Sequence, residues 1–428
     1  MFNKFISIWI TILILILIGL IMVYSSTIQK ERHFFFKQFI WILCCFIIFI
    51  QIKKLPINFY INYFYFFYAI GIFLLILVLF IGKRVHGSKS WLDFYYFSFQ
   101  PSELYKIIFI LSLAKLIFID YKKNHLFIIL LKIFFFIFLP IILIYFQPDF
   151  GSILIYLLIL FSLIYIRFLS NYLTFFFCSF FIFFVLFIFQ KIIQIYNITP
   201  KNNMIMLIIN IFTSIKFLIF FLLFLIILKI FKIIFLKNSK KFVIFLIIFT
   251  IIFFSSNYLA NLFIKKMKYY QIQRLIVFLN PFIDPLGYGY NSIQSLIAIG
   301  SGGLTGKGLF KGTQSRLGFL PEKRTDFIFS VICEELGFIG GFLILTLYFF
   351  LLFKLYNFII RLENNYMQFI GYGIFFMTFF EIIINISVSL SLIPTIGLPL
   401  PFISYGGSSL LKFTIAYSMI YRILNDDL

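Results

Sequence analysis

Apolar residues run through this chain in long stretches separated by short polar connections. The stretches Phe5 to Tyr24, Leu126 to Phe146 and Lys241 to Phe263 are each long enough to cross a bilayer as a helix. This pattern predicts an all-α polytopic membrane protein with about 10 to 12 transmembrane helices, rather than a large soluble protein with buried helices. About twelve such segments lie near residues 5–24, 36–51, 59–82, 102–119, 126–146, 150–168, 171–189, 203–236, 242–263, 326–353, 366–392 and 403–424.

Basic residues gather in alternate connections and predict the orientation. Cytoplasmic loops collect Lys and Arg, so the side that carries most of these residues should be the cytoplasm, with both termini there. Lys191 and Lys201 are exceptions that fall on the other side. The residues on the cytoplasmic side are Lys4, Lys53, Lys54, Lys122, Lys123, Arg167, Lys237, Lys240, Lys241, Lys354 and Arg361.

One long polar connection, about 264–325, falls on the outer side under the same count. It is basic, which runs against the charge bias. Either an anionic ligand on the outer face or contact with anionic lipid headgroups explains this charge, and the sequence leaves both open. Its cations are Lys265, Lys266, Lys268, Arg274, Lys307, Lys311, Arg316, Lys323 and Arg324.

Composition agrees with the membrane assignment. The chain is 63% hydrophobic and 12% charged, with a formal net charge of +22. In a soluble protein such a charge would suggest a nucleic-acid partner. Here the cytoplasmic loops account for much of it, so no nucleic-acid partner is predicted. The four cysteines lie in apolar segments, where core packing is favoured over disulfides or metal ligands.

Several kinds of chemistry are disfavoured by the motifs. The three histidines stand alone, and there is neither an HExxH motif nor a Cys/His cluster with metal spacing. The glycine-rich run from Gly300 to Gly308 fails the P-loop spacing, because Ser301 and Gly308 stand where Gly and Ser or Thr are needed. Its backbone could still approach a phosphate closely, or it could be a flexible turn.

Carboxylates at segment edges are better candidates, because the chain has only 14 acidic residues. Asp326 follows a basic run and opens an apolar segment, and Glu334 and Glu335 follow on the same predicted helix. Asp149 and Glu103 start segments after Gln-Pro pairs. An ionisable group in a membrane segment is a functional candidate. The alternative is an acid that stabilises a helix N-terminus, which is favoured less for Asp326 than for the other two segment starts.

Trp91 is the one tryptophan in a polar loop, within Gly87-Ser88-Lys89-Ser90-Trp91. It could be an interfacial anchor. It could also be a platform for a sugar or a lipid, since an exposed indole offers an apolar face and one donor.

Taken together, these stretches resemble the SEDS family (shape, elongation, division and sporulation), and its RodA-like elongation branch in particular. They cover most of the chain outside the predicted lipid-facing segments, and they occur in the same order as in the family. The matching pieces are Gly87 to Asp93, Phe99 to Glu103, Gln147 to Gly151, Gln273 to Gly337 in several runs, Gly397 to Pro401 and Ser404 to Ser408.

The resemblance implies a peptidoglycan glycosyltransferase of the bacterial inner membrane. It would join lipid II units at the outer face during elongation, together with a class B penicillin-binding protein and other elongation-complex proteins. It implies that Asp326 is the essential acid and that Trp91, Glu103 and Lys106 are also needed. We further assign substrate binding to Lys89, Arg274, Lys307, Gln314 and Ser404, and structural or regulatory roles to Glu103, Lys106, Asp149, Glu334 and Glu335.

Three features depart from the family pattern. Ser90 stands where the family usually has Arg, and Lys89 is the candidate replacement for that charge. Arg324 stands where the family usually has His. The family has about ten spanning helices, whereas 203–263 adds two. Two extra crossings keep the long loop on the same side, so the chain is still expected to be one SEDS-type domain over 1–428.

The expected mechanism uses one base. A pyrophosphate leaves without strong protonation, unlike the alcohol that a glycosidase must expel. Asp326 is therefore the expected general base on the acceptor hydroxyl, with inversion at the donor carbon. Arg274 and Lys307, with a divalent cation (Mg²⁺ or Mn²⁺) as a further candidate, would stabilise the departing pyrophosphate. A lipid-linked precursor flippase and a non-catalytic scaffold are the rival functions.

Overall fold

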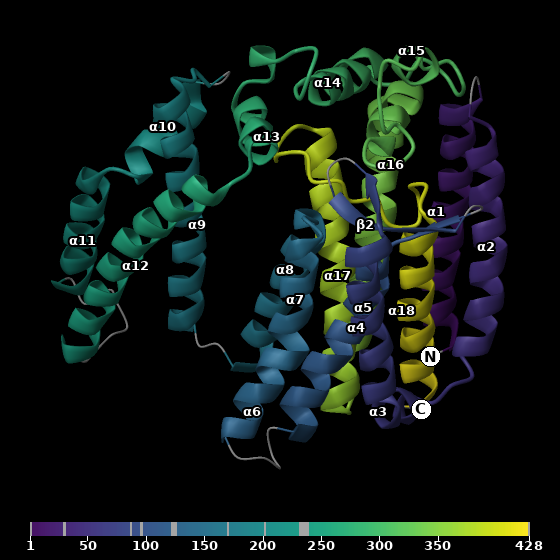
Figure 1. The fold of residues 1–428 in the computed structure, drawn as a ribbon, viewed down its shortest axis with the longest axis horizontal. Helices are drawn as coiled ribbons and strands as arrows, with labels where there is room; N and C mark the ends of the chain where they lie inside the picture. Colours follow the sequence, from purple (N-terminus) through teal and green to yellow (C-terminus); the bar gives the residue numbers. More distant parts are fainter. Residues whose placement is uncertain are drawn as a thin grey trace. The chain divides into compact units, whose positions relative to one another are not determined.

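The computed structural model describes residues 2–28, 31–85, 88–94, 97–120, 126–168, 171–200, 203–230 and 239–426, and they are mostly helical (Figure 1). The chain divides into two compact units, the first made of residues 1–163 and 294–428 and the second of residues 164–293. The expectation of one domain over the whole chain stays a prediction.

The first unit is built by two stretches that are far apart in the sequence. Its N-terminal part contains α1 (Phe2–Thr27), α2 (His33–Ile52), α3 (Ile57–Asn62), α4 (Phe64–Ile81), α5 (Pro101–Lys115), the π-helix η1 (Leu116–Asp120), α6 (Leu126–Ile133), the π-helix η2 (Phe134–Phe138), α7 (Leu139–Phe146) and most of α8 (Phe150–Phe168). Its C-terminal part contains most of α14 (Tyr290–Gly302), α15 (Thr313–Arg316), α16 (Ile328–Ile359), α17 (Asn365–Ser389) and α18 (Gly407–Asp426). Figure 1 shows α17 and α18 beside α5, which in turn packs against α4.

The second unit has its own apolar core. It comprises α9 (Asn171–Tyr196), α10 (Asn203–Phe212), α11 (Ile215–Ile230), α12 (Ser239–Lys266), α13 (Tyr269–Leu279) and the 3₁₀ turn η3 (Pro281–Ile283). Aromatic residues fill that core, with Phe183, Phe187, Phe249 and Phe253 each 5% exposed or less. The expected long segment 203–236 is bent, because α10 and α11 meet at an angle of 65°.

Eight of the described helices are long and apolar enough to cross a membrane, and the bent α10–α11 pair would make nine. Each of the twelve predicted apolar segments overlaps a helix, and residues 231–236 of the segment 203–236 lie outside the described residues. The three segments that do not pass this length and composition test are α5 with η1, α6 to α7, and α18. Two of these helices, α5 and α18, carry buried charged residues. These charges make the helices less apolar, so a test based on apolar composition does not identify them as membrane spans.

A small antiparallel sheet stands where the sequence predicts only a polar loop. Its strands are β1 (Lys83–Val85), β2 (Ser88–Phe94) and β3 (Phe97–Phe99), in the order β1-β2-β3. Side chains alternate across a strand, so Ser90 and Leu92 are buried while Trp91 is partly exposed on the other face.

Helix α16 is interrupted at Gly337, whose φ of 68° is left-handed. The backbone groups freed by this break pair with the loop after α14. The N–H groups of Lys307 and Gly308 donate to the carbonyls of Glu334 and Glu335, at 3.0 and 2.9 Å. In return, the N–H group of Phe338 donates to the carbonyl of Gly303 at 2.8 Å. The loop is therefore attached to α16 through main-chain hydrogen bonds.

Candidate active site

Asp326 lies at the end of a non-helical turn, two residues before the start of α16, and its side chain is partly exposed. Its carboxylate lies against the loop after α17. A Cβ atom added at Gly397 would be 3.6 Å from Oδ2 of Asp326. Because glycine has no side chain, the loop comes close to the carboxylate without covering it.

Ser404 is buried beneath this turn. Its hydroxyl donates to the carbonyl of Thr325 at 2.6 Å and accepts from the N–H group of Leu400 at 2.8 Å. The residue is 3% exposed. The hydroxyl therefore joins the Asp326 turn to the loop after α17. The expectation that Ser404 binds substrate stays a prediction.

Arg324, which stands where the family usually has His, contacts two side chains near the start of α2. Its guanidinium forms an ion pair with Glu31, which lies between α1 and α2. The same group lies 3.6 Å from the centre of the Phe34 ring, within the range of a cation–π interaction. The α1–α2 connection thus provides a matching acid for the arginine, and the first turn of α2 provides an aromatic face.

Glu334 and Lys307 form an ion pair that joins α16 to the loop after α14. The ammonium of Lys307 lies 2.9 Å from Oε1 of Glu334 and 2.7 Å from the hydroxyl of Thr313. The same carboxylate accepts from the N–H groups of Gln314 and Ser315, at 2.8 and 3.1 Å. Glu334 therefore caps the short helix α15. The Lys307 side chain is 25% exposed, so it is still accessible beside this acid.

The neighbouring Glu335 is fully inside the first unit, at 1% exposed. Its carboxylate accepts from the hydroxyl of Ser25 near the end of α1 and from the N–H group of Phe310 at 3.1 Å. It connects α1, α16 and the loop before α15. These contacts fit the structural role expected of both glutamates, which stays a prediction.

The Trp91 strand lies beside the C-terminal end of α4. The ammonium of Lys89 donates to the carbonyls of Leu79 and Phe80, at 2.6 and 2.7 Å, and so satisfies the last turn of that helix. Trp91 pairs across the sheet with Lys83. The substrate-binding roles of Lys89 and Trp91 stay predictions.

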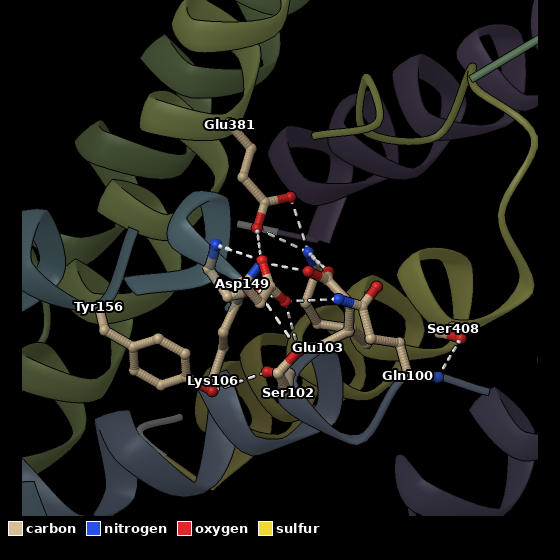
Figure 2. Close-up of polar contacts among 10 residues, drawn as sticks. Gln100, Ser102, Glu103, Lys106, Asp149, Tyr156, Glu381 and Ser408 are labelled. Atoms are coloured by element: carbon tan, nitrogen blue, oxygen red, sulfur yellow. Dashed lines mark hydrogen bonds and ion pairs between the residues drawn. The ribbon is translucent and has the colours of Figure 1, made fainter. Parts of the chain in front are cut away.

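Four charged side chains form a buried cluster between α5, α17 and α18, which we call the charge cluster (Figure 2). Lys106 donates to Glu103 at 2.5 Å and to Glu381 at 2.8 Å, and Lys412 donates to the same two acids at 2.5 and 2.6 Å. Each side chain is 3% exposed or less. Two acids and two bases balance, as a buried ionic group requires.

The sequence prediction found only half of the charge cluster. Glu103 and Lys106 were expected from their motif, but Glu381 and Lys412 were not. Each of the missed residues is a charge inside an apolar segment. That signal alone marks a functional or structural candidate and could have identified both.

Asp149 lies next to the charge cluster and caps α8. Its carboxylate accepts from the N–H group and the hydroxyl of Ser152, at 3.1 and 2.8 Å. It also accepts from the Gln100 amide at 2.7 Å and from the hydroxyl of Ser102 at 3.2 Å, just before and within the first turn of α5 (Figure 2). These contacts agree with the alternative interpretation, in which Asp149 is an acid that stabilises the N-terminus of a helix.

The remaining predicted residues are Arg274 and Gln314. Arg274 belongs to α13 in the second unit, where its guanidinium lies 5.9 Å from the Tyr270 ring centre. Gln314 lies on α15 in the first unit and is partly buried. In the first unit, Ser404 thus contacts the Asp326 turn, whereas Lys307 and Gln314 contact Glu334, eight residues after Asp326 in the chain.

Within the described parts of the chain, no group of three or more His, Cys, Asp or Glu residues could hold a metal ion. These side chains alone therefore do not form a metal site. We derive no catalytic step through a divalent cation.

Comparison with known proteins identifies the family. The model of the cell cycle protein family FTSW_RODA_SPOVE matches residues 5–210 and 201–427. The chain belongs to this family. The resemblance expected from the motifs is thereby confirmed. Among curated relatives of the family, the peptidoglycan glycosyltransferase RodA of Treponema pallidum (strain Nichols) is 31% identical over 427 residues, covering 96% of this chain and 95% of that protein.

Other members of the FTSW_RODA_SPOVE family match shorter regions or the fold. The peptidoglycan glycosyltransferase MrdB of Escherichia coli (strain K12) is 44% identical over 154 residues, which are 36% of this chain and 42% of MrdB. A solved chain from a peptidoglycan synthase complex matches with a TM-score of 0.64 and 22% identity, over 98% of this chain and 97% of its own. The crystal structure of Thermus thermophilus RodA matches with a TM-score of 0.57 and 19% identity, over 98% and 96%. These two show a shared polytopic fold.

Proposed function

We propose that this FTSW_RODA_SPOVE member is a peptidoglycan glycosyltransferase that polymerises lipid II into glycan strands during cell elongation. The observation that carries the proposal is the match to RodA of Treponema pallidum over nearly the full length of both chains. The position of Asp326 supports it, because a partly exposed carboxylate stands two residues before the start of α16, against the loop that contains Gly397.

Asp326 is the general base in this proposal. It takes the proton from the attacking hydroxyl of the acceptor sugar, and the oxygen forms a bond to the anomeric carbon of the donor. The bond between that carbon and the pyrophosphate oxygen breaks, and the undecaprenyl pyrophosphate leaves with the electron pair. Attack from the side opposite the leaving group inverts the configuration at the anomeric carbon.

Lys307 is the proposed cation that stabilises the leaving group. Its ammonium is held by Glu334 and Thr313, so its position is fixed while one quarter of the side chain stays exposed. A preorganised cation stabilises developing negative charge without moving during the reaction. Arg274, Gln314, Ser404 and Lys89 complete the proposed substrate-binding set.

The proposed location is the inner membrane, with both termini in the cytoplasm and the active site outside. The two ends of α1 support this. Near its beginning Trp9 packs against Tyr421 at the end of α18, and near its other end Ser25 bonds Glu335 of α16. Because α1 is long enough to span the membrane, the chain ends and the Asp326 turn would lie on opposite sides.

The proposed partner is a class B penicillin-binding protein, with other elongation-complex proteins around it. Support comes from the fold match to a chain of a peptidoglycan synthase complex in which polymerization and crosslinking are coordinated. A separate transpeptidase is chemically consistent, because the proposed site contains a base and cations for glycosyl transfer only.

The test is polymerisation of purified lipid II by the purified protein with its transpeptidase partner. Wild type is compared with Asp326→Asn and with a control, Glu363→Gln, which removes an exposed acid between α16 and α17. Loss of a general base lowers the rate by about 10²- to 10⁴-fold, and the control should retain activity. Polymerisation by Asp326→Asn at the wild-type rate would contradict the assignment of the base.

The same experiment distinguishes the proposed enzyme from the two rival functions, because neither rival function produces glycan. A flippase would move lipid II across vesicle membranes without making glycan, and a scaffold would do neither. Absence of product from the wild type, with the partner shown to be bound, would therefore contradict the enzymatic proposal.

For Trp91, we predict that Trp91→Ala raises the KM for lipid II, whereas Trp91→Phe keeps most of the stacking surface and has a smaller effect. An unchanged KM in the alanine variant would leave only the role of an interfacial anchor.

A further inference from the structure

The turn that ends in Asp326 is fixed by its backbone. Helices satisfy their own carbonyls, but a non-helical turn must find donors elsewhere. Three consecutive carbonyls of this turn accept hydrogen bonds from outside it. The N–H group of Tyr405 donates to the carbonyl of Arg324 at 2.8 Å, and the hydroxyl of Ser404 donates to the carbonyl of Thr325 at 2.6 Å. The third bond comes from a different element, α17.

Asn385 of α17 supplies that third bond. Its side-chain NH₂ group donates to the carbonyl of Asp326 at 2.9 Å and also to the carbonyl of Leu398 at 2.7 Å. Leu398 follows Gly397, the residue that lies against the Asp326 carboxylate. One amide therefore connects the backbone of the acid with the loop beside its carboxylate.

The chemistry of the contact requires a side chain with two donor hydrogens. An amide NH₂ group has two, a hydroxyl has one, and an ionised carboxylate has none. Both partners of Asn385 are carbonyl oxygens, which also fixes the orientation of the amide. The residue is 1% exposed, so water does not readily replace it.

Two other polar residues, Ser389 and Glu381, lie on the same face of α17 as Asn385. Ser389, one turn further, donates to the Asn385 carbonyl at 3.1 Å and lies 3.5 Å from the Asp326 carbonyl. Glu381, one turn earlier, belongs to the charge cluster. Residues four apart lie on one side of a helix. The helix that carries Asn385 is thus held by the charge cluster on the side that faces the Asp326 turn.

We propose that Asn385 is a positioning residue that sets the location of Asp326 by holding the Asp326 and Leu398 carbonyls together. It does not touch the reacting atoms. This inference rests on the proposed function, in which Asp326 is the general base. A base must lie within hydrogen-bond reach of the proton that it removes, and a small displacement strongly lowers the rate.

The experiment measures kcat and KM for lipid II polymerisation with the partner bound. The variants are Asn385→Leu, which has similar size and no donor, and Asn385→Asp, which cannot donate to both carbonyls in either protonation state. The control is Thr378→Val on the same helix. Thr378 is also fully buried; its hydroxyl donates to the Ile374 carbonyl within α17 and accepts from the hydroxyl of Tyr417 at 3.5 Å, away from the Asp326 turn. Thermal unfolding in detergent is recorded for every variant.

We expect kcat of both Asn385 variants to fall by about 10- to 100-fold. KM should change by less than about threefold, because substrate binding uses other groups. The midpoint of unfolding should match that of Thr378→Val, and the control should retain its kcat. If Asn385→Leu does not fold, Asn385→Asp with its nearly unchanged volume decides the question.

Wild-type kcat in a folded Asn385 variant would overturn the inference. A loss of kcat that Thr378→Val shares, or that follows a matching fall in the unfolding midpoint, would also overturn it, because it indicates a general packing role. Asp326→Asn is measured in parallel. Activity in that variant contradicts the general base, whereas an inactive Asp326→Asn with fully active Asn385 variants contradicts only the positioning role.

Discussion

The charge cluster and the Asp326 turn differ in how their carboxylates are held and in how far they are exposed. In the charge cluster, the side chains themselves are bonded to one another, and all four are 3% exposed or less. At the turn, it is the main chain that is bonded, through Arg324, Thr325 and Asp326, while the acid stays partly exposed.

If Asp326 is the general base as proposed, this contrast distinguishes a charge used for assembly from a charge used for chemistry. A buried ion pair is satisfied only by its partners, so removing one partner leaves an uncompensated charge in the core. A catalytic carboxylate must instead be located accurately and still be accessible to a substrate. Fixing its backbone achieves both. Mutations in the two regions should therefore affect different quantities.

The largest expected effect on stability is at the charge cluster. Lys412→Met removes one base and leaves Glu103 and Glu381 with only Lys106, so we expect a loss of about 3–5 kcal/mol in the free energy of unfolding. Denaturant or thermal unfolding of the purified protein in detergent measures it. A loss below that of an ordinary surface substitution would show that the cluster does not hold α5, α17 and α18 together.

A paired replacement sharpens this prediction. Glu381→Gln combined with Lys412→Met removes one acid and one base and restores the charge balance. The double variant should be more stable than the sum of the two single losses implies, with a coupling of about 0.5–3 kcal/mol. Strict additivity would contradict the interaction between the two residues.

A smaller effect is expected where a carboxylate caps a helix. Asp149→Ala removes the acceptor for Ser152 at the start of α8 and for Gln100 and Ser102 near α5. Loss of such a cap costs about 0.5–2 kcal/mol. If Asp149→Ala instead keeps full stability while polymerisation is lost, the residue has a direct role in the reaction.

The smallest expected effect is at the ion pair between Glu31 and Arg324. The two side chains are 40% and 21% exposed, so solvent screens their attraction. Glu31→Gln should lower the free energy of unfolding by less than about 1 kcal/mol. The comparison with Lys412→Met on the same unfolding assay tests whether burial decides the contribution of each charge. An equally large loss would show that it does not.

The sequence predicted the parts of this molecule that depend on local pattern. Each of the twelve predicted apolar segments overlaps a helix in the described part of the chain, because a long apolar run in a bilayer can satisfy its backbone only as a helix. The FTSW_RODA_SPOVE family followed from motifs that are contiguous in the chain. Asp326 was expected at the start of an apolar segment, and α16 begins at Ile328.

Features that depend on partners far along the chain were not predicted. Lys412 bonds to Glu103, and Asn385 bonds to Asp326, across separations that carry no local signal. The ion pair of Arg324 with Glu31 is of the same kind. The three-stranded sheet around Trp91 was missed because β1 and β3 have only three residues each and β2 begins in a polar stretch.

The break in α16 at Gly337 has a mechanical consequence. Main-chain bonds join residues 303–308 to both sides of the break, and a Cβ atom at Gly306 would collide with the Glu335 carbonyl. The segment of α16 before Gly337, which starts just after Asp326, is thus linked to the loop by bonds that no side-chain substitution removes. Because the loop is bonded on both sides of Gly337, a displacement of the loop would be transmitted both to the first turns of α16 and to the part of the helix after the break.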